Sequence, residues 1–148
     1  MKKLKYSLLI LVVFGVLATF ENCGGSSDET AKDRTIRILT AKTEWTVSSV
    51  QTPANTATDP SQWTNFKVSF TKSNMTTSGH PTGAQAVWPS GTYTVSEDGK
   101  TITRGDNIVM LFNPITESNF TATFSVPAGT EIGGRIEALG GDYTFNMK

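Results

Sequence analysis

The chain contains a single cysteine, Cys23, in the stretch FENCGGSSDE (20–29), and its chemistry can be narrowed by elimination. One cysteine cannot form an internal disulfide, and one thiolate without neighbouring ligands does not make a zinc site. A Cys–His nucleophile would require Cys23 to leave a Gly-Gly-Ser-Ser tether and reach His80, the only histidine in the chain. We therefore expect Cys23 to serve neither catalysis nor metal binding.

The other residues that could do acid–base chemistry lie in turn-like sequence. His80 is part of Ser-Gly-His-Pro-Thr-Gly, and no hydroxyl or carboxylate is spaced to act with it. Asp98, Asp106 and Asp142 each adjoin a glycine, as turn aspartates often do. The common phosphate-loop, hydrolase, zinc-protease and calcium-loop motifs do not occur. These patterns predict a histidine on a surface turn, no metal or other cofactor, and no enzymatic activity.

The residues before the cysteine read as an export signal. Lys2, Lys3 and Lys5 form a positive start, and an apolar or neutral run of 15 residues, 6–20, follows. This run is short for a hydrocarbon core about 30 Å thick. With Cys23 directly behind it, the segment resembles a bacterial lipoprotein signal, in which the cysteine becomes the first mature residue and carries acyl chains. Two alternatives stay open: cleavage nearby by an ordinary signal peptidase, leaving a free thiol, and an uncleaved anchor helix.

The lipoprotein resemblance predicts how the chain is divided. It implies a signal peptide at 1–22, a flexible tether at 23–29 and a folded domain at 30–148. It also implies that acyl chains on Cys23 hold the protein in the cell envelope, and we expect the outer membrane. Each buried CH₂ group adds about 0.8 kcal/mol, so two or three chains would make the anchor essentially permanent.

Length and charge limit what the folded part can be. The 148 residues leave room for one domain, and 37% hydrophobic with 18% charged residues fits a globular protein. Net charge is zero for the whole chain, but without residues 1–22 there remain 10 basic and 12 acidic residues, a net charge of −2. Because a nucleic-acid surface needs a basic patch that displaces counterions, we expect no nucleic-acid partner.

The domain is expected to begin with a helix and to continue in strands. The stretch TAKDRTIRILTA (30–41) lacks Gly and Pro and places apolar residues at helical spacing. After Glu44, strand-like segments follow one another. They are WTVSSV (45–50), FKVSF (66–70), a short strand near Met75, IVMLF (108–112), NFTATFSV (119–126), RIEAL (135–139) and DYTFNMK (142–148). IVMLF is apolar on both faces, which predicts a central or well-covered strand.

The strongest local signal is GTYTVSEDGKTITR (91–104), which predicts a β-hairpin. Asp98-Gly99 favours a two-residue type I′ turn. Folding the chain about this turn places Val95 opposite Ile102, so that apolar residues meet across the strands. With this hairpin there are about eight short strands separated by turns. They predict an all-β fold, an antiparallel meander that closes into a barrel behind a short N-terminal helix.

Several segments together resemble the lipocalin-like bacterial lipoproteins, a largely uncharacterised group of small secreted β-barrel proteins. The segments are Cys23, ILTAKTEWTV (38–47), AVWPSGTYTV (86–95), SEDGKTITR (96–104) and GDYTFNMK (141–148). They cover most of the chain after residue 22. The resemblance implies an up-and-down lipocalin-like barrel, secretion and anchoring in a membrane.

Aromatic residues separate two hypotheses for the function of such a lipoprotein. After residue 22 there are six Phe, three Trp and two Tyr residues, which could line a pocket for a small apolar ligand or fill the barrel. A carrier, our first prediction, needs an open mouth and an unfilled interior. The alternative is a solid interaction module for a surface protein or glycan, and the bulk of the six Phe residues favours a filled core. Trp63 and Trp88, in or beside loops, are the expected ligand or rim contacts, although either could instead cover the barrel end.

Overall fold

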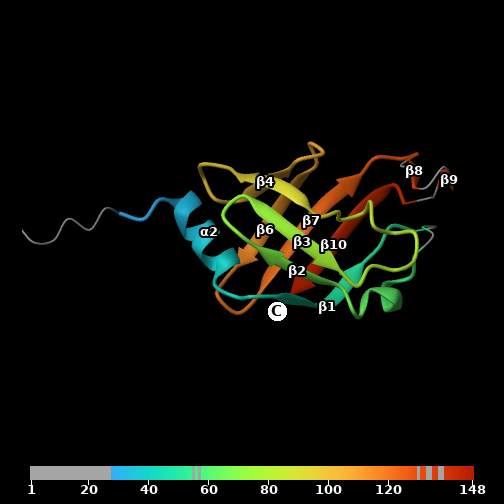
Figure 1. Ribbon diagram of the computed structural model, residues 1–148, viewed down its shortest axis with the longest axis horizontal. Helices are drawn as coiled ribbons and strands as arrows, with labels where there is room; N and C mark the ends of the chain where they lie inside the picture. The colour runs from blue at the N-terminus through green and yellow to red at the C-terminus, as the bar shows by residue number, and fades with distance from the viewer. Residues whose placement is uncertain (1–27, 55, 57, 130, 133–134, 137–138) are drawn as a thin grey trace, which may run out of the picture.

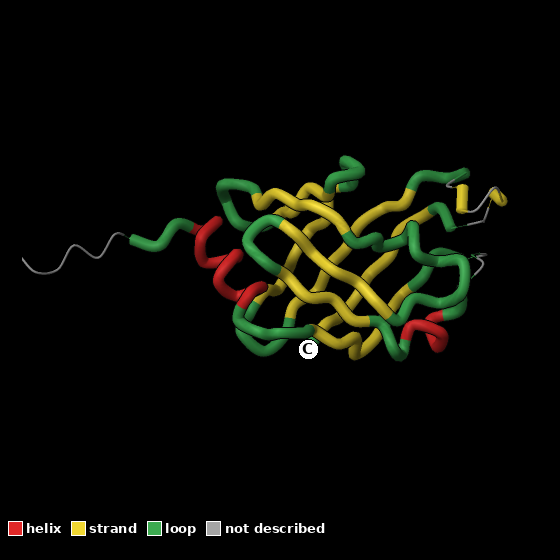
Figure 2. Tube along the Cα trace, in the orientation of Figure 1, coloured by secondary structure: helices red, strands yellow, loops and turns green. Residues whose placement is uncertain are grey.

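The computed structural model describes residues 28–54, 56, 58–129, 131–132, 135–136 and 139–148. Within this part of the chain, eight antiparallel strands close into a barrel, and helix α2 (Ala31–Thr40) lies at one end of it (Figures 1 and 2). The barrel strands are β1 (Trp45–Gln51), β2 (Lys67–Phe70), β3 (Asn74–Ser78), β4 (Gly91–Val95), β5 (Thr101–Arg104), β6 (Val109–Ile115), β7 (Phe120–Val126) and β10 (Gly141–Met147). The predicted fold class, an antiparallel barrel behind a short helix, is confirmed.

The strands follow one another around the barrel in chain order, and β10 closes the barrel by pairing with β1. Two further strands, β8 (Glu131–Ile132) and β9 (Arg135–Ile136), pair only with each other, at the end of the barrel opposite α2 (Figure 1). The prediction that RIEAL (135–139) forms a full strand is therefore wrong. Its first two residues form β9, and residues 137–138 lie outside the described part of the chain.

Alternating side chains build the core, as the sequence pattern predicts. In β7 and β10 every second residue points inward and is buried: Phe120, Ala122, Phe124, Val126, Tyr143, Phe145 and Met147. Strand β6 is central, as predicted, between β5 and β7, and its buried side chains are Met110 and Phe112, with Ile115 partly buried against the core. The intervening Val109 and Leu111 are 55% and 45% exposed, so β6 is covered on one side only.

The predicted hairpin has the expected register but a different turn. Val95 lies opposite Ile102, as the sequence predicts, and Tyr93 lies opposite Arg104. The turn is closed by a 2.9 Å hydrogen bond from the Gly99 N–H to the Ser96 carbonyl. A type I′ turn needs positive φ at both central residues, and of the Asp98-Gly99 pair only Gly99 has it, at 69°. The type I′ assignment is therefore wrong, although the glycine remains required.

Helix α2 forms where the sequence predicts it and closes the barrel end. Thr30 caps its N-terminus, since the Thr30 Oγ1 accepts a 3.0 Å hydrogen bond from the Asp33 N–H. The inner face buries Ile38 and Leu39 against the core. The Trp45 Nε1–H donates a 2.9 Å hydrogen bond to the Leu39 carbonyl, which ties the end of the helix to the first strand.

Candidate functional site

The barrel interior near α2 is filled by aromatic rings. Phe120 is the centre of this group, with its ring centroid 4.9 Å from that of Trp45 and 5.0 Å from that of Phe112. Phe70 lies 6.1 Å from Phe120 and 5.5 Å from Tyr93. These separations are those of rings in direct contact. Rings from five strands, β1, β2, β4, β6 and β7, thus meet inside the barrel.

A second group of rings fills the barrel toward the opposite end. The Phe145 centroid lies 5.0 Å from that of Trp63, 5.1 Å from that of Trp88 and 5.2 Å from that of Phe66. Phe124 stacks on Phe145 at 5.8 Å with an angle of 8° between the ring planes. These contacts fill the barrel interior with side chains, in agreement with the filled core that the sequence favours.

Trp63 and Trp88 are placed as lids beneath loops. Trp63 ends the short 3₁₀ helix η1 (Pro60–Trp63), which Asp59 caps, and Trp88 lies in the loop between β3 and β4. Both side chains are 0% exposed. Neither ring reaches the surface, so both occupy the covering position that the sequence left open, and their contact with a ligand or partner stays a prediction. Sequence position beside a loop does not reveal whether a Trp ring turns inward.

His80 takes part in the same cover rather than lying on a surface turn. Its Nε2 is 2.8 Å from the Trp88 carbonyl oxygen, and its half-buried ring meets the edges of Phe66 and Trp63. The centroid separations are 5.1 and 6.2 Å. His80 therefore holds the β3–β4 loop against the barrel mouth, and the expected surface position is corrected.

Arg104 is a buried cation that the sequence reasoning missed. It is 2% exposed, and its guanidinium donates a 2.7 Å hydrogen bond to the Val87 carbonyl and a 3.0 Å hydrogen bond from Nε to Asp106. A further N–H pairs with the second carboxylate oxygen of Asp106. The strand alternation could have revealed this residue, because Arg104 shares the inward side of β5 with Ile102.

The Arg104–Asp106 pair connects the β3–β4 loop to the turn after β5. Burial alone would raise the pKa of Asp106, but the hydrogen bond and the positive charge of Arg104 outweigh it and hold that pKa below its ordinary value. The guanidinium carbon also lies 5.4 Å from the Phe124 ring centroid. Through its bonds to Asp106 and to the Val87 carbonyl, Arg104 holds the β3–β4 loop against the barrel end.

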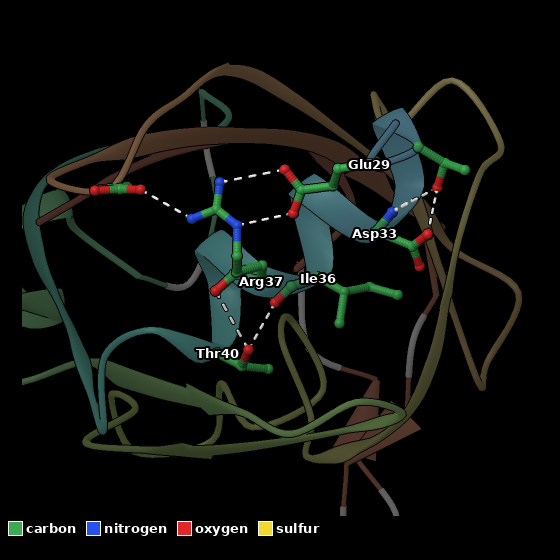
Figure 3. A network of polar contacts seen from close by, with 7 residues as sticks. Glu29, Asp33, Ile36, Arg37 and Thr40 are labelled. Carbon is green, nitrogen blue, oxygen red and sulfur yellow. Dashed lines mark hydrogen bonds and ion pairs between the residues drawn. The ribbon is translucent and has the colours of Figure 1, made fainter. Parts of the chain in front are cut away.

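At the other end, Arg37 fixes the point where the chain enters the domain (Figure 3). Its Nε and one terminal nitrogen donate to the two carboxylate oxygens of Glu29, at 2.8 and 3.4 Å. Its other terminal nitrogen donates to Glu117 at 2.9 Å, in the turn between β6 and β7. These bonds raise the pKa of Arg37. Glu29, the last residue of the predicted tether, is therefore held against the α2 end of the barrel.

A groove of about 640 Å³ lies beside α2, and we call it the α2–β6 groove. Its walls come from three elements: α2 with Arg34 and Ile38, the β4–β5 turn with Asp98 and Lys100, and β6 with Leu111 and Ile115. The groove is lined by the exposed Leu111 and also by the core residues Ile38 and Phe112. Its size is within the range of about 300–1,000 Å³ usual for small-molecule sites. Sequence reasoning did not predict it, since it depends on how the helix packs on the hairpin turn.

The predicted attachment residue Cys23, the signal peptide at 1–22 and most of the tether lie outside the described residues. In the part that is described, His, Cys, Asp and Glu side chains form no group of three or more suited to a metal ion. None of the helices described here is long and apolar enough to cross a membrane.

Comparison with known proteins leaves the description at the level of the fold. The eight-stranded antiparallel barrel is compatible with the lipocalin-like architecture that the sequence resembles. No protein-family model matches the chain, and the search of curated proteins finds no match either.

Proposed function

We propose that this chain is a non-enzymatic lipoprotein of the cell envelope, anchored in the outer membrane through acyl chains on Cys23. Its barrel would act as an interaction module for a protein or glycan of the cell surface. The anchor rests on the sequence, in which a positive start and the apolar run 6–20 directly precede Cys23. Glu29, only six positions after Cys23, is already held against the domain by Arg37.

The observation that carries the choice of an interaction module over a carrier is the filled interior. Phe145 and the rings of Trp63, Trp88 and Phe66 occupy the centre of the barrel with centroid separations of 5.0–5.5 Å. A small apolar ligand inside the barrel would have to displace them. Trp88 is also held by a hydrogen bond, since its Nε1–H donates to the Met75 sulfur at 3.3 Å. Partners would then meet the outer surface.

The anchor is tested by the intact mass of the mature protein from cells grown with a labelled palmitate analogue. We expect a chain that begins at Cys23, carries the mass of acyl chains and incorporates the label. Cys23→Ser should abolish the label and the acyl mass. An unacylated chain that begins near Cys23 would indicate an ordinary signal peptidase, and an uncleaved chain would indicate an anchor helix; either result rejects the lipoprotein proposal.

The choice between module and carrier is tested by native mass spectrometry of the protein released from membranes. A solid barrel should give the mass of the protein with no small-molecule adduct other than membrane phospholipid. A stoichiometric adduct of another small molecule that is lost on denaturation would show an internal site and favour the carrier. The mass of that adduct would then identify the ligand class.

A further inference from the structure

The α2–β6 groove combines an apolar floor with walls that carry two cations and two acids. Ile38 and Phe112 are buried beneath it, and Leu111 lines it while remaining 45% exposed. Leu111 and Val109, two residues apart on the same strand, are the exposed large hydrophobic residues of the described part of the chain. An exposed apolar residue inside a groove suits an apolar ligand group better than isolated exposure on a flat surface does.

The charges around the groove favour an anion. Arg34 and Lys100 line it, and neither side chain donates a hydrogen bond or forms an ion pair with any described residue. The two acids of the groove are engaged instead. Both oxygens of Glu29 accept from Arg37, and Asp98 accepts from the Ser96 hydroxyl at 2.6 Å and from the Lys100 N–H at 3.1 Å. Asp98 keeps its negative charge and interacts with the charge of Lys100, so with Glu29 paired to Arg37 one net positive charge, with Arg34 unbonded, is left to meet an external anion.

The position of the groove restricts where its ligand comes from. Glu29 lines the groove and is six residues from Cys23. Even a fully extended chain of that length reaches at most about 20 Å. If Cys23 is acylated, as the proposed function requires, the groove cannot lie farther than this from the headgroup layer. A tether this short keeps phospholipids at a high effective concentration beside the groove.

We propose that the α2–β6 groove binds an anionic phospholipid of the membrane that holds the anchor. Arg34 and Lys100 take the phosphate, and Leu111 and Ile115 contact the start of an acyl chain. The α2 end of the barrel is then the face that rests on the membrane. The opposite end, with the β3–β4 loop, faces away from it and is free for partners. This inference rests on the proposed function for the source of its ligand.

The test uses photocrosslinking in the full-length protein in bacterial membranes. p-Benzoylphenylalanine is placed at Leu111, or, as the matched control, at Val109, which is 55% exposed on the same face of β6 and does not line the groove. We expect a phospholipid adduct at position 111, with an anionic headgroup by mass, and little or none at position 109. Because both positions are exposed, the substitutions should leave the fold intact, which a thermal melt checks.

A second variant tests the role of the charges. Arg34→Gln combined with Lys100→Gln should reduce the anionic adduct at position 111 about tenfold, because each cation near an anionic surface contributes to binding. Equal adducts at positions 109 and 111, an adduct of zwitterionic lipid that ignores the double variant, or a protein adduct at position 111 would each overturn the proposal.

Flotation of the same membranes separates this proposal from the proposed function. If the protein floats with membranes but gives no adduct at position 111, the anchor stands and the groove proposal fails. If the protein is not in the membranes, the anchor fails, and the full-length protein is crosslinked with dihexanoyl phosphatidylglycerol below its micelle concentration. An adduct at position 111 then supports the groove as a phospholipid site, and its absence overturns it.

Discussion

At the scale of single residues, Gly99 is required twice over. Its φ is 69°, and a Cβ at this position would lie 2.5 Å from the Ala31 carbonyl oxygen and 2.8 Å from the Thr35 Oγ1. We expect Gly99→Ala to pay both a backbone strain of about 1–3 kcal/mol and an overpacking cost of about 1–3 kcal/mol. Thermal or chemical unfolding measures the total.

Gly129 provides the matched control for this prediction. Its φ is 78°, but a Cβ there would find nothing within 4 Å. Gly129→Ala should therefore show the backbone strain alone, about 1–3 kcal/mol. Equal losses of unfolding free energy in the two variants would contradict the close packing of α2 on the hairpin turn.

Asp106 gives a prediction for pH dependence. Its pKa in the folded protein is lowered from the ordinary value of 3.8, with Arg104 outweighing the effect of burial. A carboxylate with a depressed pKa stabilises the folded state at neutral pH, and this contribution disappears as the pH falls from about 4 toward the lowered pKa. Asp106→Asn should therefore lower the melting temperature at neutral pH and lose this deficit in acid. A deficit that is the same between about pH 7 and about pH 2 would reject the role of the ion pair.

At the scale of elements, one buried hydrogen bond joins α2 to the β4–β5 turn. The Thr35 hydroxyl donates to the Gly99 carbonyl at 2.8 Å, and Thr35 is 4% exposed. Thr35→Val keeps the shape but leaves that carbonyl without this partner, so we expect a loss of about 1–3 kcal/mol of unfolding free energy. Thr40→Val is the control, because the Thr40 hydroxyl bonds to the Ile36 carbonyl within the helix. A loss at Thr40 as large as that at Thr35 would reject the special role of this contact.

The elements were predictable where local patterns decide them. Alternation located β2, β7 and β10, and the absence of Gly and Pro with helical spacing located α2. The turn type was not, because the closing hydrogen bond from the Gly99 N–H to the Ser96 carbonyl centres the turn on residues 97–98, one position before the Asp98-Gly99 pair. The exposed face of β6 was not predictable either, since five apolar residues in a row, 108–112, do not reveal that one face of the barrel wall meets solvent.

The candidate sites were less predictable than the elements because each depends on contacts between distant segments. The charge of Arg104 is balanced by Asp106, and its guanidinium donates a hydrogen bond to a loop carbonyl 17 residues earlier in the chain. Only the assembled barrel end therefore shows why a cation can be buried there. The α2–β6 groove needs three elements at once. Trp63 and Trp88 point inward because loop closure places them there, which residue type alone does not encode.

At the scale of the whole molecule, the barrel behaves as a solid body if its rings are as closely packed as their contacts indicate. Phe145 contacts Trp63, Phe66 and Trp88, and it is 0% exposed. Phe145→Ala should cost about 3–5 kcal/mol of unfolding free energy, because the surrounding rings relax only partly into the space. Chemical denaturation measures this loss, and Val109→Ala, at a 55% exposed position, should cost less than about 0.5 kcal/mol.

The same variant tests whether the barrel can be turned into a binding protein. A cavity lined by apolar side chains stays dry and takes up small aromatic molecules such as benzene. We therefore expect Phe145→Ala, and not the parent protein, to bind benzene, with a rise in melting temperature as the benzene concentration increases. If the parent protein binds benzene as tightly as the variant does, its interior already contains usable space. The carrier, rather than the solid module, would then be the better account of this barrel.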